Sequence, residues 1–159
     1  MTVKKVLLVC TGNICRSPLA AALLERALGE RGAEIDVSSA GTGAWDGAPV
    51  SEGAYLVGLE QGLDLSGHRA RLLTRDLVEH SDLVLTMARH HRARVDELGG
   101  EGRVFVLGEY AGRTGDAAEV SDPFGGDLDV YRDTCAELAD IIAAAVERIV
   151  AEAGHGDQR

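Results

Sequence analysis

The sequence is poor in cysteine, proline and aromatic residues, and it has no long apolar run. Three of its 159 residues are cysteines, three are prolines and 4% are aromatic. The cysteines are too few for a disulfide scaffold and do not combine with histidines at metal-site spacing, so we expect neither a metal nor another cofactor. No apolar stretch approaches the ~20 residues of a membrane span, and residues 1–5 show no signal-peptide pattern. We therefore expect a cytoplasmic protein.

Basic residues are also few. Sixteen Lys and Arg residues stand against 26 Asp and Glu residues, which gives a formal net charge of −10. A surface of this sign repels nucleic acid and anionic membranes, so we expect neither as a partner. Solubility alone is the simplest reason for the excess of acid.

What the chain does have is an alternation of short apolar runs and helical patterns. Its length fits one domain, and the alternation is typical of an α/β fold. We expect a single domain with about four parallel strands in one twisted sheet and helices on both faces. The domain is predicted to span residues 1–153, followed by a flexible tail at 154–159. The predicted strands are 6–9, 34–39, 82–87 and 103–107, and the predicted helices are 18–32, 51–63, 74–80, 88–98 and 128–152.

The stretch at residues 10–17 follows the first predicted strand and has the features of an anion site. Ser17 and Pro18 predict a helix start, with Ser17 as the N-cap and Pro18 as the first helical residue. A loop at a helix N-terminus presents free backbone N–H groups and the positive end of the helix dipole. Ligands of parallel sheets bind at the carboxyl ends of the strands, which is where this loop begins.

The side chains of this loop suit a phosphoryl group. Gly12 lets the backbone approach the anion, Asn13 tolerates a positive φ, and Arg16 can bind two oxygens through its planar guanidinium. Cys10 lies in the same field, which favours its thiolate, and Ser17 can donate a hydrogen bond to the sulfur. The predicted chemistry is hydrolysis of a phosphate ester or phosphoramidate through a phosphocysteine intermediate. The alternative is a buried cysteine at a strand end near a surface arginine. The predicted phosphate-binding residues are Thr11, Gly12, Asn13, Ile14, Cys15, Arg16 and Ser17.

Asp122 lies in a long predicted loop, residues 108–126, and is followed by Pro123. Departure of a poor leaving group needs a proton donor, and a carboxylic acid on a loop can provide it. Pro123 keeps Asp122 out of helical geometry. Taken alone, the pair is equally consistent with an ordinary Asp-Pro turn. The competing acids are Asp116, Asp127 and, less favourably, Asp129.

Four stretches of the sequence resemble the low-molecular-weight protein tyrosine phosphatase family. Residues 10–18 (CTGNICRSP) look like its phosphate loop, and residues 39–42, 66–71 and 122–124 resemble later blocks in the same order. The resemblance covers nearly the whole chain except the last several residues. It implies phosphorylated protein substrates. The roles that it implies for the reacting groups are Cys10 as nucleophile, Arg16 as phosphate ligand, and Asp122 as general acid and then general base.

The resemblance also implies roles for neighbouring residues. Cys15 would form a reversible disulfide with the nucleophile and shield it from overoxidation, although an inert core residue is the alternative. Ser39 and His68 would support the loop, with His68 hydrogen-bonded to Asn13; the alternative for His68 is a surface histidine. Cys135 is predicted to be a core residue. The family's arsenate-reducing relatives need a further cysteine pair that this chain lacks, so that activity is not expected.

Ile14, Trp45 and Phe124 are the predicted apolar walls of the phosphoryl pocket, where a phenyl ring could stack. Trp45 could instead pack inward. The run at residues 122–127 (DPFGGD) resembles the protein arginine phosphatase branch of the family, whereas that branch carries threonine where this chain has Ile14. We favour phosphotyrosine as substrate, because Ile14 lies in the loop that contacts substrate; phosphoarginine is the alternative.

Two further hypotheses concern how the protein binds phosphorylated partners: as a phosphopeptide-binding module without turnover, or with a basic run that guides the substrate. A phosphopeptide-binding module would need neither a thiolate nor an acid, and the presence of both in this chain argues against that hypothesis.

A basic run could steer an acidic phosphoprotein to the site, but a solvated helix face is the simpler interpretation. The run consists of Arg89, His90, His91, Arg92 and Arg94. We expect a monomer.

Overall fold

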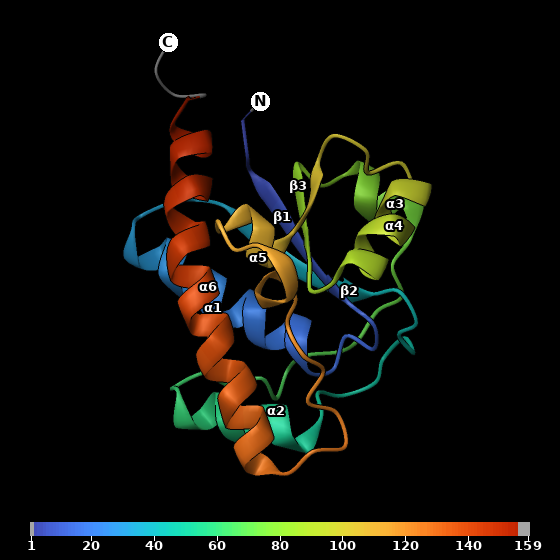
Figure 1. The fold of residues 1–159 in the computed structure, drawn as a ribbon, viewed down its shortest axis with the longest axis vertical. Coiled ribbons are helices and arrows are strands. Elements are labelled where there is room, and N and C mark those ends of the chain that lie inside the picture. Colours follow the sequence, from blue (N-terminus) through green and yellow to red (C-terminus); the bar gives the residue numbers. More distant parts are fainter. Residues whose placement is uncertain (1, 156–159) are drawn as a thin grey trace.

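Strand β1 (Lys5–Cys10) lies inside the sheet and ends at the predicted nucleophile. In the computed structural model, which describes residues 2–155, four parallel strands form one sheet in the order β2-β1-β3-β4 (Figure 1). The predicted α/β fold with four parallel strands is confirmed. The other strands are β2 (Asp36–Gly41), β3 (Leu83–Thr86) and β4 (Val104–Val106).

Helices connect the strands, and two short helical segments lie within residues 107–118, where the sequence predicts the last residue of a strand and then a loop. These segments have too few residues to show a helical period, and close packing of Gly108 against Ala118 fixes them. A Cβ at Gly108 would lie 2.1 Å from the carbonyl oxygen of Ala118. The helices are α1 (Arg16–Glu30), α2 (Glu52–Glu60), α3 (Arg75–Glu79), α4 (Arg89–Glu97), α5 (Leu107–Tyr110), the 3₁₀ segment η1 (Gly115–Ala118) and α6 (Leu128–His155).

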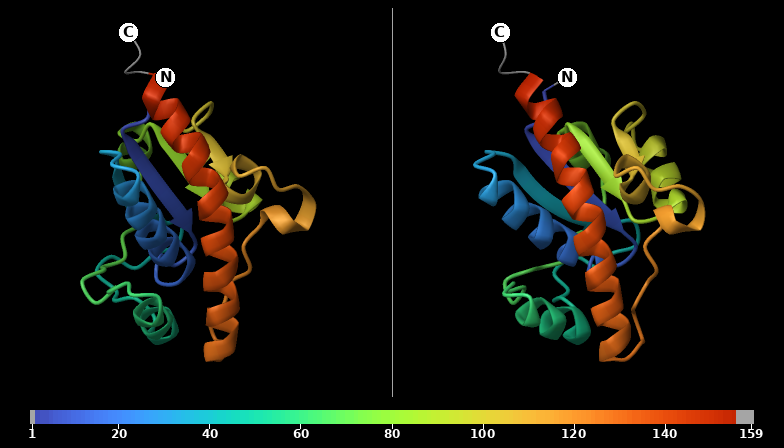
Figure 2. Two further views of the ribbon diagram at one scale, coloured as in Figure 1. Left: turned by 90° about the vertical axis from the view of Figure 1, so that its left-hand side faces the viewer. Right: turned by 60° about the vertical axis from the view of Figure 1, so that its left-hand side comes forward.

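The two faces of the sheet bury separate apolar layers, as the period of two along a strand requires. Val6 and Leu8 of β1 pack in the cluster that includes α1 and α6, whereas Leu7 and Val9 pack with residues of α3 and α4. Figure 1 shows α1 and α6 on one side of the strands and α3 and α4 on the other, and Figure 2 shows α6 running along the sheet. The continuous apolar run of β1 therefore reflects burial on both faces.

Helix α1 begins two residues earlier than the sequence predicts. Its N-cap is Cys15, which makes no side-chain cap, so Ser17 and Pro18 occupy the second and third helical positions. Proline is tolerated there because the first four N–H groups of a helix have no partner within the helix. The Ser17 hydroxyl contacts the loop instead of capping the helix.

Helix α6 ends at His155, two residues beyond the predicted end of the domain at 153. The helix continues past its predicted end at 152, and residues 152–154 are half-buried. The predicted tail residues 156–159 lie outside the described residues. Within residues 2–155, no helix combines the length and the apolar character of a membrane span.

Candidate active site

The loop between β1 and α1 surrounds the sulfur of Cys10 with hydrogen-bond donors. Cys10 is 2% exposed, and its Sγ accepts from the backbone N–H of Asn13 over 3.3 Å. Ser17 Oγ lies 2.9 Å from Sγ and accepts from Asn13 Nδ2 over 2.8 Å. The Ser17 hydroxyl hydrogen is therefore free to point at the sulfur. Because both donors stabilise negative charge, the sulfur is placed to react as a thiolate.

Asn13 holds the loop in shape through its buried side chain and backbone. Its φ of 56° is the only left-handed value of a non-glycine among residues 2–155. Asn13 Nδ2 also donates to Ser39 Oγ over 2.9 Å, and Oδ1 accepts from the backbone N–H of Arg71 over 3.0 Å. Its carbonyl lies 2.7 Å from His68 Nε2 and accepts from it. Ser39 and His68, which the resemblance implies as supports of the loop, both reach it through Asn13.

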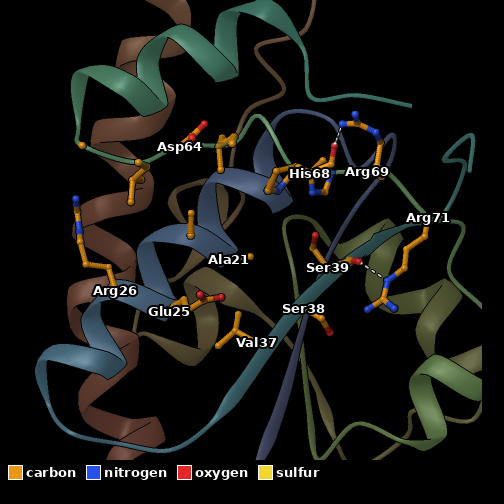
Figure 3. Close-up of a pocket in the computed structure, with 15 residues that line it drawn as sticks. Ala21, Glu25, Arg26, Val37, Ser38, Ser39, Asp64, His68, Arg69 and Arg71 are labelled. Carbon is orange, nitrogen blue, oxygen red and sulfur yellow. Dashed lines mark hydrogen bonds between the residues drawn. The ribbon is translucent and has the colours of Figure 1, made fainter. Parts of the chain in front are cut away.

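Behind this network is a hollow of about 660 Å³ between α1, β2 and the segment 62–71. Figure 3 shows Ser39 and His68 on its walls, with Arg71 donating to the Ser39 carbonyl from Nε over 2.9 Å. Burial lowers the pKa of His68, more than the carbonyl of Asn13 raises it. The ring is therefore neutral near pH 7 and donates to Asn13 through Nε2. The hollow backs the loop, and the reacting groups line a different cavity.

That cavity has a volume of about 250 Å³ and lies at the carboxyl end of β1. It brings together the three groups for which the sequence predicts roles in catalysis: a thiol, a guanidinium and a carboxyl group. The lining residues are Cys10, Thr11, Gly12, Ile14, Cys15, Arg16, Asp122 and Phe124.

Gly41 allows the neighbouring chain to close in on the loop. It pairs with Cys10 at the end of β2, and its amide donates to the carbonyl of Arg71 over 3.0 Å. A Cβ at this position would lie 2.3 Å from the carbonyl oxygen of Thr11, well inside contact distance. Any larger residue would therefore displace the loop between β1 and α1.

Arg16 extends from the first turn of α1 into the cavity and is 5% exposed. Its Nη1 donates to the carbonyl of Val120 over 3.0 Å, and its Nη2 lies 3.7 Å from Asp122 Oδ2. Its Nε is buried and finds no hydrogen-bond partner among residues 2–155. An unpaired buried donor is costly, and an oxygen of a bound phosphoryl group would satisfy it.

Asp122 is the only one of the four candidate acids that lines the cavity. Its side chain is 53% exposed, and its Oδ1 accepts from the backbone N–H of Phe124 over 3.1 Å. Val120, two residues earlier, donates to the carbonyl of Met87 over 2.9 Å, which fixes this segment beside β3. Asp127 caps α6 by accepting from the N–H of Val130. Asp116 lies in η1, and Asp129 lies in the first turn of α6.

Two of the three predicted walls line the cavity and one does not. Ile14 and Phe124 are among its lining residues. Trp45 is not, and its side chain is 84% exposed, so it neither forms a wall here nor packs inward. The reason is the pairing of its loop with a segment that is distant in the sequence: Gly47 donates to the carbonyl of Ala70, and Ala70 donates to the carbonyl of Ala48. This pairing leaves the indole in solvent.

All three cysteines lie in the described residues, and each is buried and free. Cys15 Sγ lies 3.2 Å from Ser51 Oγ and 3.5 Å from the hydroxyl of Tyr131, and burial raises its pKa. Cys135 packs in the core between the helices, as predicted, and burial raises its pKa as well. For Cys15, burial outweighs the two hydroxyl contacts, each of which lowers the pKa of the thiol.

The basic run at the start of α4 is not simply a solvated face, because His91 is fully buried. Its Nε2 lies 2.8 Å from Thr11 Oγ1, in the loop that follows Cys10. Arg89 and Arg92 are exposed but pair with Glu109, which reduces their use in steering a substrate. The sequence could not reveal the contact of His91, since 80 positions separate it from Thr11.

Comparison with known proteins places this geometry in a family. Residues 5–154 match the family model described as low molecular weight phosphotyrosine protein phosphatase. A probable low molecular weight protein-tyrosine-phosphatase, EpsP of Ralstonia solanacearum, is 38% identical and is matched over 92% of this chain and 97% of its own length. The protein-arginine-phosphatase of Bacillus subtilis (strain 168) is 36% identical, over 91% of this chain and 95% of its own.

A solved structure supports the same relationship and bears on the chemistry. The YwlE arginine phosphatase superposes with a TM-score of 0.86 at 34% identity, over 92% of this chain and 95% of that one. That structure is of a cysteine-to-serine variant with a phosphorylated active-site serine.

Proposed function

This chain belongs to the low molecular weight phosphotyrosine protein phosphatase family, and from that premise we propose that it hydrolyses phosphotyrosine in proteins through a phosphocysteine intermediate on Cys10. One observation carries the proposal: a thiol, a buried guanidinium and a carboxyl group line a single cavity at the end of a strand. A module that only binds phosphopeptides would need neither the thiol nor the carboxyl group.

In the first step, Cys10 Sγ attacks phosphorus in line with the leaving oxygen. The S–P bond forms as the bond between phosphorus and the phenolic oxygen breaks, and Asp122 delivers its proton to that oxygen. Arg16 binds the phosphoryl oxygens with its free Nε and its terminal nitrogens, supported by the backbone N–H groups of the loop. The Ser17 hydroxyl stabilises the thiolate before attack.

In the second step, water cleaves the phosphocysteine. Asp122, now a carboxylate, takes a proton from the water as its oxygen bonds to phosphorus, and the S–P bond breaks to release phosphate and the Cys10 thiolate. The exposure of half of the Asp122 side chain gives water access to the carboxylate. The phosphorylated serine in the related arginine phosphatase supports a covalent intermediate at this position.

The choice of substrate depends on the mouth of the cavity, where Ile14 and Phe124 lie. An apolar branched side chain gains free energy by contact with a phenyl ring, at about 25 cal/mol per Å² buried. The same side chain leaves the N–H donors of a guanidinium unpaired, at a cost of about 1–3 kcal/mol. We therefore expect a preference for phosphotyrosine over phosphoarginine of about tenfold to a hundredfold.

The experiment compares kcat/KM for phosphotyrosine and phosphoarginine substrates in the parent, Ile14→Thr and Ile14→Val. Threonine and valine have nearly the same shape, so only the hydroxyl differs between the two variants. We expect the threonine variant to shift toward phosphoarginine and the valine variant to keep the parent's preference. A parent that prefers phosphoarginine would contradict the substrate assignment and would favour the alternative function suggested by the DPFGGD run. Fresh protein inert on both substrates would contradict the phosphatase proposal itself.

We further propose that Cys15 resolves a sulfenic acid on Cys10 by forming a disulfide, which reductant then cleaves. Both residues line the same cavity and belong to one short loop, which supports the pairing.

A nucleophile of this kind works in a reducing compartment, so we propose that the protein acts in the cytoplasm. We propose that it acts as a monomer, with one complete set of reacting groups in one chain.

A further inference from the structure

The buried histidine of α4 makes a hydrogen bond at each ring nitrogen. His91 is the third residue of α4, and its Nδ1 lies 3.1 Å from the backbone nitrogen of Ala88, the residue before the helix. Its Nε2 lies 2.8 Å from Thr11 Oγ1. The ring thus connects the start of α4 to the residue that follows the nucleophile.

The partners of His91 define where its proton lies. A backbone N–H can only donate, so Nδ1 must accept from Ala88 and carries no hydrogen. Burial, followed by the charges of His90 and Arg16, lowers the pKa of His91 to about 3, so the ring is neutral near pH 7. The remaining hydrogen is on Nε2, which donates to Thr11 Oγ1.

Thr11 depends on this bond for its position, since the residue itself is exposed and gains little from packing. On the β2 side, the Thr11 carbonyl accepts from Gly43 over 2.9 Å, and the Cys10 carbonyl accepts from Thr42 over 2.9 Å. On the α4 side, the side chain of Thr11 is held by its hydrogen bond with His91, which we call the tether. The peptide after the nucleophile is thus held between the loop after β2 and the first turn of α4.

We propose that His91 is a positioning residue for catalysis, which orients the first amides of the phosphate loop through Thr11. The inference rests on the proposed function. The amides that follow the nucleophile must point at the equatorial oxygens of the transferring phosphoryl group, and their value depends on being oriented before the reaction. Losing the tether to Thr11 therefore weakens binding of the transition state more than binding of the ground state.

Two conservative substitutions separate the two hydrogen bonds of His91. In His91→Asn, the amide oxygen reaches the place of Nδ1 and still accepts from the N–H of Ala88, which caps the helix. The bond to Thr11 is lost. In His91→Gln, the amide nitrogen reaches the place of Nε2 and keeps the bond to Thr11, but the cap is lost.

We expect His91→Asn to lower kcat on an aryl phosphate about three- to tenfold with KM nearly unchanged. Inhibition by vanadate, which mimics the five-coordinate transition state, should weaken by the same factor, whereas inhibition by inorganic phosphate should not. His91→Gln should recover kcat while its Tm falls below that of His91→Asn. The matched control is His80→Asn, the same substitution at a histidine whose Nδ1 donates to the carbonyl of Asp76 on α3. It should leave kcat unchanged.

Thr11→Val tests the same tether from its other end, with His91 and its cap in place. We expect Thr11→Val to reproduce the loss of kcat, and His91→Asn to cost nothing more in that background. Three results would each overturn the inference and leave the proposed function intact. They are losses of kcat that add up in the double variant, a low kcat in His91→Gln, and a parental kcat in His91→Asn. A parent that hydrolyses no aryl phosphate would contradict both.

Discussion

The two segments that supply the reacting groups differ in how they are held. In the phosphate loop, residues 10–17, Cys10 and Asn13 are buried, and a hydrogen-bond network fixes the backbone. In the acid segment, residues 120–124, the side chain of Asp122 is 53% exposed and that of Phe124 is 66% exposed. One region is oriented before substrate arrives, whereas the other faces solvent.

This difference separates two tasks. Charge that develops on the phosphoryl oxygens needs dipoles already in place, because moving them during the reaction would cost free energy. A proton donor must instead reach different leaving groups and later a water molecule, which an exposed carboxyl group permits. We therefore expect substitutions in residues 10–17 to affect phosphate binding and catalysis, and substitutions in 120–124 to affect proton transfer while leaving the fold intact.

The largest effect should come from Cys10→Ser. A serine hydroxyl stays protonated where the thiol would ionise, so turnover should fall more than about a thousandfold. Phosphate binding, measured by titration, should persist because the loop keeps its shape. Cys135→Ala, which removes a buried thiol from α6, serves as the control and should keep parental turnover. Activity above about a thousandth of the parent in Cys10→Ser would rule out Cys10 as the nucleophile.

Asp122→Asn should slow the first chemical step on phenyl phosphates by about a hundredfold to ten-thousandfold. The penalty should shrink for leaving groups that depart without a proton, and Tm should stay close to that of the parent because the side chain is half exposed. Asp127→Asn is the matched control, since asparagine also caps α6. An equal penalty for all leaving groups would show that Asp122 positions the segment and does not donate a proton.

Arg16→Lys tests whether geometry or charge binds the phosphoryl group. An ammonium keeps the charge but not the planar set of donors, so kcat/KM should fall by about a hundredfold to a thousandfold, and inhibition by phosphate should weaken. Arg26→Lys, farther along α1, is the control. Near-parental kcat/KM in the Arg16 variant would mean that this guanidinium does not bind phosphate.

The smallest effect is confined to oxidising conditions. After mild peroxide, thiol reductant should restore the parent, whereas Cys15→Ser should stay inactive, because its sulfenic acid has no resolving thiol and oxidises further. Activities are measured relative to the untreated form of each protein. Equal recovery of both proteins would show that Cys15 does not protect the nucleophile.

Local sequence predicted the parts of the site that are close together along the chain. The spacing from Cys10 to Arg16 places a thiol and a guanidinium around one helix N-terminus, and that arrangement needs no distant contact. The exact helix start was wrong, since a Ser-Pro pair fits two positions in the first turn. Trp45 was predicted as an apolar wall of the pocket, but pairing of its loop with residues near Ala70 leaves it in solvent.

The sequence by itself determined the alternation of strands and helices, the strand that leads to Cys10 and the composition of the phosphate loop. These follow from periodicity and from the conformations that individual residues allow, which are local properties. Only the tertiary structure decided that Asp122 and not Asp127 lines the cavity, that Arg16 has an unpaired Nε, and that His91 is buried against Thr11. Those facts depend on which surfaces meet when the two layers pack on the sheet, and residues far apart in the chain carry no local signal of that contact.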